Sequence, residues 1–354
     1  MSLELAARTL RLAFRDPFRI ARSHAEEGAT TVVGELHSSR RPDLVGLGEG
    51  YPDAFYGENP DTMSVVMPHL VAAVEPFEER LLEGTVDDAR DALAAAADAM
   101  TAALRWNGAA KCLVDTALHD LVGKAHDVAL VDLLGLSRTI PPTDFTLGLD
   151  EPAVVAERAR RAAAFPALKI KVGGPDDLAT LRAVRDVYDG PIRVDANTGW
   201  TLDAGRRLLP ELARLGVELV EQPFPPRRLD WLGRLQADSP LPIVADESAV
   251  VDEDLDSLVG LVAGVNVKLA KCGGPGPAAR MLARARDLGF RTFLGCMEET
   301  SIGIAASAAV ASLADWVDLD GCLLLADDPA VGLDLDADQR WRLPTEPGLG
   351  VRLA

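Results

Sequence analysis

The chain has 354 residues, 48% of them hydrophobic, and its 55 Asp and Glu against 36 Lys and Arg give a formal net charge of −19. A charge of that sign repels phosphate backbones and anionic lipid surfaces, so we expect a soluble protein that binds neither nucleic acid nor membranes. The four cysteines lie far apart without a C-x-x-C pair, which argues against a zinc site and against a disulfide framework and fits a cytoplasmic protein in a reducing environment.

Three segments near the N-terminus, 3–12, 30–36 and 45–49, alternate apolar and polar residues in the manner of antiparallel strands. They predict a three-stranded antiparallel meander. The segment from Val45 to Gly50, with glycine at every second position, is superficially similar to a phosphate-binding loop. No helix starts directly after it, because Tyr51-Pro52 follows, so we interpret its glycines as tight-turn residues and not as a nucleotide site.

The next part of the chain has a helical pattern, with Ala and Leu at three- and four-residue spacing over 63–82, 86–104 and 109–133. Helices of this kind are expected to cover one face of the meander, and Pro141-Pro142 ends the run. We therefore predict three parts: an α+β capping domain over 1–140, a barrel over 141–321, and a tail over 322–354 that returns to the capping domain.

From residue 144 onward, short apolar runs rich in β-branched residues recur, and the central ones end in charged residues. Successive charged ends lie 26, 26, 25 and 22 residues apart, at Lys169, Asp195, Glu221, Asp246 and Lys268. Each interval accommodates one strand, one helix and two loops. With similar runs at 144–149, 290–294 and 316–320 the count reaches eight, which predicts an α/β barrel whose functional residues lie at the C-terminal strand ends.

Three of these charged ends, Asp195, Glu221 and Asp246, close successive strands and are expected to meet at the barrel mouth. Three carboxylates in a partly desolvated site would repel one another strongly without a cation. Oxygen ligands without nitrogen or sulfur favour a hard ion, and three ligands leave coordination positions open, as Mg²⁺ requires. The sequence therefore predicts one Mg²⁺ per subunit. The five histidines all precede the barrel strands, so a histidine-ligated metal is not expected there.

Lysines are predicted on both sides of this metal site. Lys169 and Lys171 share one face of their strand, and Lys268 ends the strand after the triad, so Lys171 and Lys268 should flank a metal-held ligand. A lysine beside a metal ion and a second lysine has its neutral form favoured and can act as a general base. Two bases on opposite faces of one carbon can remove a proton and return it on the other side. This arrangement predicts racemisation or epimerisation α to a carboxylate, with the metal stabilising the enolate.

Five motifs in this order resemble those of the enolase superfamily, muconate-lactonising subgroup, over nearly the whole chain: Lys169-Ile170-Lys171, Asp195-Ala196-Asn197, Glu221-Gln222-Pro223, Asp246-Glu247-Ser248, and Val267-Lys268 with Gly273-Gly274. The resemblance implies a (β/α)7β barrel, TIM-like but with the last strand running directly into the tail. Within the subgroup, Asp318-Leu319-Asp320 resembles the pair of carboxylates by which dipeptide epimerases, of the L-Ala-D/L-Glu epimerase kind, bind the free α-ammonium of their substrate.

By that resemblance Lys171 and Lys268 form the acid/base pair, and Lys169 assists them electrostatically. The resemblance also implies supporting and substrate-lining positions, which are Asn197 and Glu247 beside the metal ligands, and Thr146, Met297 and Thr300 around the substrate. Loops near 19–27 and 53–59 would close over it. We expect a small dipeptide as substrate and a homo-oligomeric enzyme.

Three alternatives of the same superfamily use the same lysines and metal: an N-acylamino acid racemase, an o-succinylbenzoate synthase and a muconate-type cycloisomerase. A non-catalytic ligand-binding barrel is a fourth. Only Asp318 and Asp320 distinguish the dipeptide epimerase from the other three enzymes.

The preferred dipeptide depends on the charges around the mouth. Arg19 and Arg22 lie where an arginine could bind a glutamate side chain, but several acids share the loops: Glu26, Glu27, Asp53, Glu58 and Glu298. An acidic mouth attracts cationic side chains and repels a second carboxylate. We therefore predict a preference for neutral or basic dipeptides over Ala-Glu.

Overall fold

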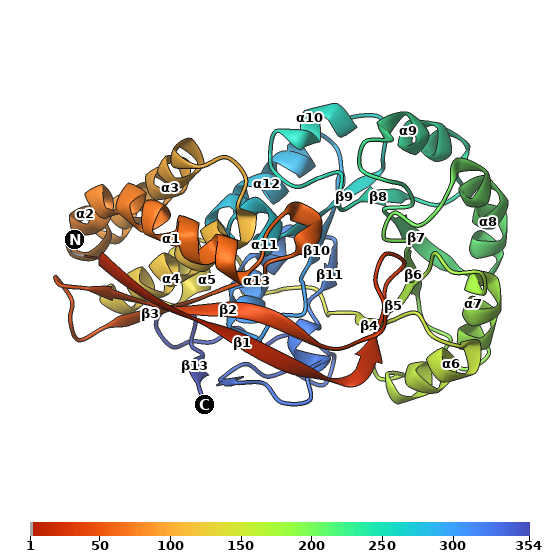
Figure 1. Ribbon diagram of the computed structural model, residues 1–354, viewed down its shortest axis with the longest axis horizontal. Coiled ribbons are helices and arrows are strands. Elements are labelled where there is room, and N and C mark those ends of the chain that lie inside the picture. Colours follow the sequence, from red (N-terminus) through yellow and green to blue (C-terminus); the bar gives the residue numbers. More distant parts are fainter. Residues whose placement is uncertain (1–2) are drawn as a thin grey trace.

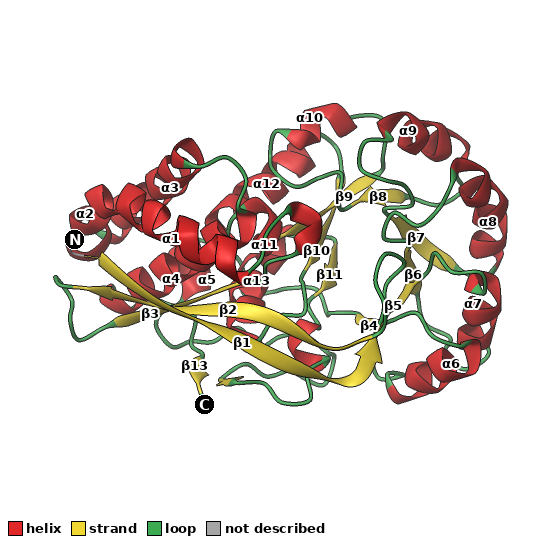
Figure 2. Ribbon diagram, in the orientation of Figure 1, coloured by secondary structure: helices red, strands yellow, loops and turns green. Residues whose placement is uncertain are grey.

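The computed structural model describes residues 3–354 and has two parts, a sheet covered by helices and a barrel of parallel strands (Figure 1). Figure 2 shows the barrel strands as an inner ring with helices outside them. The predicted fold class is confirmed: an α/β, (β/α)7β barrel with an N-terminal capping domain. None of the helices within residues 3–354 has both the length and the apolar character that crossing a membrane requires.

The capping sheet consists of β1 (Leu3–Phe18), β2 (Glu26–Ser38) and β3 (Val45–Gly50), antiparallel and in that order, as the alternating patterns predict. β1 is six residues longer than predicted, because it pairs with β2 again beyond a register irregularity, at Phe18 and Glu26. The hairpin reaches the barrel, where the carbonyl oxygen of Arg19 accepts a hydrogen bond from the amide of Leu149. Its tip thus brings residues 19–25 to the mouth of the barrel.

The glycines of β3 lie in a strand and not in a turn, so the interpretation of these glycines as tight-turn residues is wrong. Gly46, Gly48 and Gly50 share the face that packs on α4 (Gly108–Ala125). A Cβ atom at Gly48 would lie 2.0 Å from the carbonyl oxygen of Leu113, and one at either of the other two would lie 2.2 Å from an α4 carbonyl. Only glycine permits a strand to pack this closely on a helix backbone.

The other helices of the capping domain are α1 (Pro60–Val74), α2 (Glu78–Glu83), α3 (Val86–Ala103) and α5 (Leu130–Leu133). Asn59 and Thr85 begin α1 and α3 as capping boxes, in which each side chain accepts the amide of the third helical residue. The first and third predicted helical segments are each interrupted. Pro76 lies in the 3₁₀ turn between α1 and α2, and Asp127 after α4 has a left-handed φ of 55°.

Eight parallel strands form the barrel: β4 (Phe145–Leu147), β5 (Leu168–Lys171), β6 (Ile192–Asp195), β7 (Val217–Glu221), β8 (Ile243–Ala245), β9 (Gly264–Lys268), β10 (Arg291–Gly295) and β11 (Trp316–Asp318). Each predicted run overlaps one of them. The first and last strands are joined by a hydrogen bond from the Asp144 amide to the Val317 carbonyl oxygen.

Helices fill the seven connections between these strands: α6 (Pro152–Arg161), α7 (Asp177–Arg185), α8 (Leu202–Arg214), α9 (Leu229–Asp238), α10 (Asp254–Leu258), α11 (Leu269–Cys272) with α12 (Pro275–Asp287), and α13 (Ser301–Val310). After β11 the tail contains a small two-stranded sheet of β12 (Ala330–Val331) and β13 (Arg352–Leu353). Leu325 forms a bridge with Phe14 of β1, and Gly348 one with Ala129, so the tail contacts both ends of the capping domain.

Candidate active site

Three buried carboxylates lie together at the C-terminal ends of neighbouring barrel strands. Asp195 and Glu221 are the last residues of β6 and β7, paired in register, and Asp246 directly follows β8. One oxygen of each lies within 4.8 Å of the others. Burial, and then repulsion by Asp195, raise the pKa of Glu221 to about 8. A buried set of oxygen donors in which one member resists ionisation fits a hard divalent cation.

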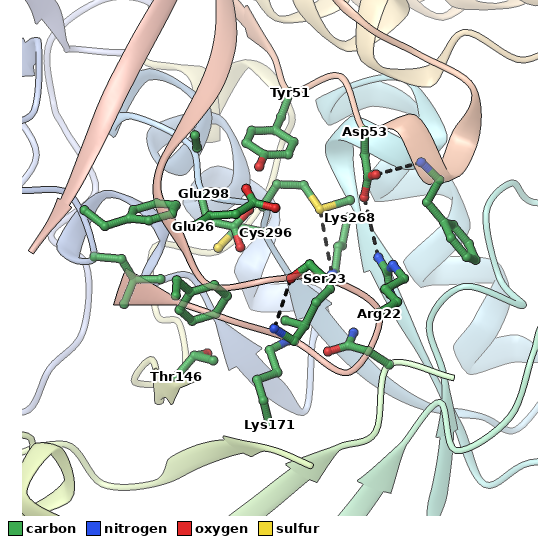
Figure 3. Close-up of a pocket in the computed structure, with 18 of the residues that line it drawn as sticks. Arg22, Ser23, Glu26, Tyr51, Asp53, Thr146, Lys171, Lys268, Cys296 and Glu298 are labelled. Carbon is green, nitrogen blue, oxygen red and sulfur yellow. Dashed lines mark hydrogen bonds and ion pairs between the residues drawn. The ribbon is translucent and has the colours of Figure 1, made fainter. Parts of the chain in front are cut away.

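Two lysines approach the triad from strands on either side of it. Lys171 ends β5, and its Nζ lies 2.8 Å from Asp195 Oδ2, whereas Lys268 ends β9, with Nζ 3.0 Å from Asp246 Oδ2. Both line one cavity (Figure 3). Burial by itself would lower the pKa of Lys268, but the charges of Asp246, Glu221 and Asp195 together raise that pKa above its ordinary value. These carboxylates therefore favour the ammonium form of Lys268.

Lys169 connects the triad with the last barrel strand. Its Nζ lies 2.7 Å from Asp318 Oδ2, 2.9 Å from Glu221 Oε2 and 3.4 Å from Asp195 Oδ2. The side chain is 1% exposed. An ammonium enclosed by three carboxylates cannot serve as a free base, so Lys169 acts through the charge that it contributes to its neighbours.

Asp318, Asp320 and Thr146 form a second polar group beside Lys169. The Thr146 hydroxyl donates to Asp318 Oδ1 at 3.0 Å, and its amide donates to Asp320. The pKa of Asp320 is raised well above its usual range by burial and by the charge of Asp318. Burial would raise the pKa of Asp318, but the charges of Lys169 and Lys171, with hydrogen bonds to Lys169 and Asp144, together lower it. Asp320 is thus a buried carboxyl that a bound cation would stabilise in its charged form.

Other polar side chains hold the carboxylates of the triad in place. Asn197 donates its amide N–H to Asp195 Oδ1 at 2.9 Å, and its side-chain Nδ2 lies 3.2 Å from Asp195 Oδ2 and 3.4 Å from Glu247 Oε1. Glu247 in turn accepts a hydrogen bond from Arg22. Both positions implied by the resemblance therefore lie beside the triad, within hydrogen-bond distance of it or of each other.

Sequence reasoning missed three supporting residues, Lys271, Asn266 and Gln222. The buried Nζ of Lys271 donates to an Asp246 carboxylate oxygen and to the carbonyls of Asp246, Asn266 and Ala249. Asn266 donates to Glu221 Oε1 at 2.8 Å, and Gln222 Oε1 accepts the Asp246 amide. Asn266 was detectable, since it shares the inward face of its strand with Lys268 two residues later.

The cavity above these groups has a volume of about 740 Å³ and is lined by barrel and capping-domain residues. Met297 and Glu298 line it, and Met297 Sδ lies 4.0 Å from Lys268 Nζ. Thr300 is buried elsewhere, where its hydroxyl and amide donate to Glu49 of β3. Arg22 lines the cavity but its guanidinium contacts Glu247 and Asp53 and stacks on Phe55. The Arg22 guanidinium therefore already has partners for its charge within the protein.

Two family models match the chain: the mandelate racemase/muconate lactonizing enzyme N-terminal domain over 6–135, and the enolase C-terminal domain-like model over 153–354. An L-Ala-D/L-amino acid epimerase of Pedosphaera parvula is 34% identical over 100% of this chain and 99% of that protein. An L-Ala-D/L-Glu epimerase of Bacteroides thetaiotaomicron is 39% identical over 69% of this chain, a match that spans 64% of that protein. Among solved structures, a dipeptide epimerase from Enterococcus faecalis complexed with Mg and L-Leu-L-Tyr is 30% identical and superimposes with a TM-score of 0.85, covering 99% of both chains.

Proposed function

The chain belongs to the mandelate racemase and muconate lactonizing enzyme group of the enolase superfamily, and we propose that it is a Mg²⁺-dependent dipeptide epimerase. The observation that carries the proposal is the buried pair Asp318 and Asp320 beside Lys169, in the cavity that also contains Lys171 and Lys268. A pair of carboxylates there offers a partner for a free α-ammonium, which N-acylated or ring-forming substrates lack. The related epimerases named above support this choice of substrate class.

Asp195, Glu221 and Asp246 would hold the Mg²⁺, since all three are buried and one oxygen of each lies close enough to the others to coordinate the same ion. The chemistry that this ion would supply when bound is stabilisation of the negative charge that develops as the proton α to a carboxylate leaves. Asp246 would then share its charge with a cation, which weakens its hold on the Lys268 ammonium and favours the neutral amine.

Lys171 and Lys268 then act as two bases on opposite faces of the substrate α-carbon. One amine removes the proton, and the ammonium on the other face returns a proton, which inverts the centre. Lys169 stays protonated between Asp318 and the triad. Its fixed charge favours loss of the substrate proton and orients Asp318 toward the substrate ammonium.

Mass spectrometry in D₂O tests this function. With Mg²⁺ present, we expect L-Ala-L-Ala to acquire one solvent deuterium at the α-carbon of its second residue and to yield the L,D epimer. N-Acetyl-L-Ala-L-Ala should react poorly, and Asp320→Asn should raise KM for the free dipeptide about a hundredfold, because only the free amine needs the carboxylate. Equal turnover of free and N-acetylated substrates would favour an N-acylamino acid racemase instead.

A further inference from the structure

Two acidic side chains, Glu26 and Glu298, project into the cavity from separate parts of the chain. Glu26 is the first residue of β2, and Glu298 lies in the loop between β10 and α13. Figure 3 shows them side by side, next to Tyr51. Although Glu26 is exposed as a whole, partial desolvation of its carboxyl and the charges of Glu298 and Asp53 raise its pKa. Capping domain and barrel thus each contribute one carboxylate to the same wall.

The charges of this wall are not balanced within the protein. Each cation that lines the cavity has a carboxylate partner: Arg22 has Glu247 and Asp53, and the three lysines have the triad or Asp318. Neither Glu26 nor Glu298 forms an ion pair with a lysine or arginine of the chain over residues 3–354. A ligand that brings its own positive charge would complete the wall.

The position of Glu298 identifies which end of the substrate it faces. Its loop follows β10, which lies in the barrel between β9, the Lys268 strand, and β11, which carries Asp318. In Figure 3 Glu26 and Glu298 lie on the same side of the cavity as Thr146, which contacts Asp318 and Asp320. Arg22 and Asp53 lie on the other side, where Arg22 forms an ion pair with Glu247.

We infer that Glu26 and Glu298 select a lysine or arginine side chain on the N-terminal residue of the dipeptide. The inference rests on the function proposed above, in which the substrate carboxylate is held near the triad and the α-ammonium near Asp318 and Asp320. The side chain of the N-terminal residue then starts from the Asp318 side and extends along the wall that carries the two glutamates. Its charge would meet two carboxylates, whereas an acidic side chain would meet like charges.

The test compares kcat/KM for L-Lys-L-Ala, L-Ala-L-Ala, L-Ala-L-Lys and L-Glu-L-Ala, measured as α-deuteration in D₂O with saturating Mg²⁺. We expect L-Lys-L-Ala to exceed L-Ala-L-Ala by about tenfold or more, L-Ala-L-Lys to stay close to L-Ala-L-Ala, and L-Glu-L-Ala to be the poorest substrate. A lysine preference at the second position instead of the first would overturn the assignment of the wall to the N-terminal residue.

Variants test whether Glu26 and Glu298 cause the preference for L-Lys-L-Ala. Glu26→Gln and Glu298→Gln should each lower the ratio of L-Lys-L-Ala to L-Ala-L-Ala about tenfold, and Glu27→Gln should leave it unchanged, because Glu27 is exposed and does not line the cavity. Glu26 is itself exposed, so its variant is expected to fold even if the Glu298 variant does not. Deuteration of L-Ala-L-Ala as fast as L-Lys-L-Ala would overturn this inference alone, whereas the absence of deuteration in all four dipeptides would overturn the proposed function.

Discussion

The floor and the wall of the cavity are built differently. On the floor, formed by β5 to β9 and α11, the charged side chains are buried. Two of them have several partners: Lys169 contacts three carboxylates and Lys271 four oxygens. Above the floor, the hairpin of β1 and β2 carries Arg22 in its loop and Glu26 at the start of β2. Glu26 is exposed, and the Arg22 side chain is 24% exposed. Under the proposed function, the strand ends would fix the chemistry, and the loops, which can vary independently, would fix the choice of substrate.

The largest effect is expected from the floor, with Lys268→Ala. Epimerisation should fall by about 10⁴-fold, because no other side chain can exchange a proton on that face. Deuterium exchange of one epimer through Lys171 should continue, which separates loss of one base from loss of the site. We would measure the deuteration of L,L and L,D dipeptides separately. Equal deuteration of both epimers in the variant would contradict the two-base assignment.

Removal of the metal or of one ligand charge should have the next largest effect. We expect excess EDTA to abolish activity, and Glu221→Gln to lower kcat/KM about a thousandfold while the circular dichroism spectrum stays that of the wild type. Gln has nearly the shape of Glu and can still accept a hydrogen bond from Asn266. Full activity in EDTA would show that the triad serves only to neutralise the lysines.

The difference between the barrel floor and the loops above it also explains which features of the structure the sequence could predict. The barrel strands and their charged ends follow from a repeat of 22 to 26 residues, since an alternating strand fixes which side chains face inward. The close packing of the β3 glycines and the ion pairs of the Arg22 guanidinium could not be predicted in this way. Both depend on which distant segment packs nearby, α4 in one case and Glu247 in the other. Residues whose role comes from such contacts carry no local signal.

A third prediction concerns the base of the second capping loop. The buried carboxylate of Glu58 accepts the amide of Ala109, at the start of α4, and burial raises its pKa to about 7. A carboxyl whose pKa rises on folding stabilises the folded state most below its unfolded pKa of about 4.5, and that contribution is lost as the pH rises to about 7. The loss is on the order of 3 kcal/mol for a shift of this size.

Urea unfolding at pH 4.5 and pH 8 measures this effect. The free energy of unfolding of Glu58→Gln should fall less between the two pH values than that of the wild type, since the amide does not ionise. Glu4→Gln, at an exposed position of β1, should match the wild type. Parallel pH dependence in wild type and Glu58→Gln would show that ionisation of Glu58 costs nothing in the folded loop.

The smallest effect is expected for Arg22→Gln, and it decides between two roles for Arg22. If Arg22 fixes the hairpin loop over the barrel through Glu247 and Asp53, its loss lowers kcat/KM about tenfold for every dipeptide alike, because loop closure then costs more for each. If Arg22 instead binds a substrate carboxylate, the loss is confined to L-Ala-L-Glu. Arg19→Gln is the matched control, an exposed arginine of the same loop that does not line the cavity. A uniform decrease in Arg22→Gln, with the L-Lys-L-Ala preference intact, would assign loop closure to the arginine and selection to the two glutamates, so that neighbouring residues of one hairpin serve separate steps.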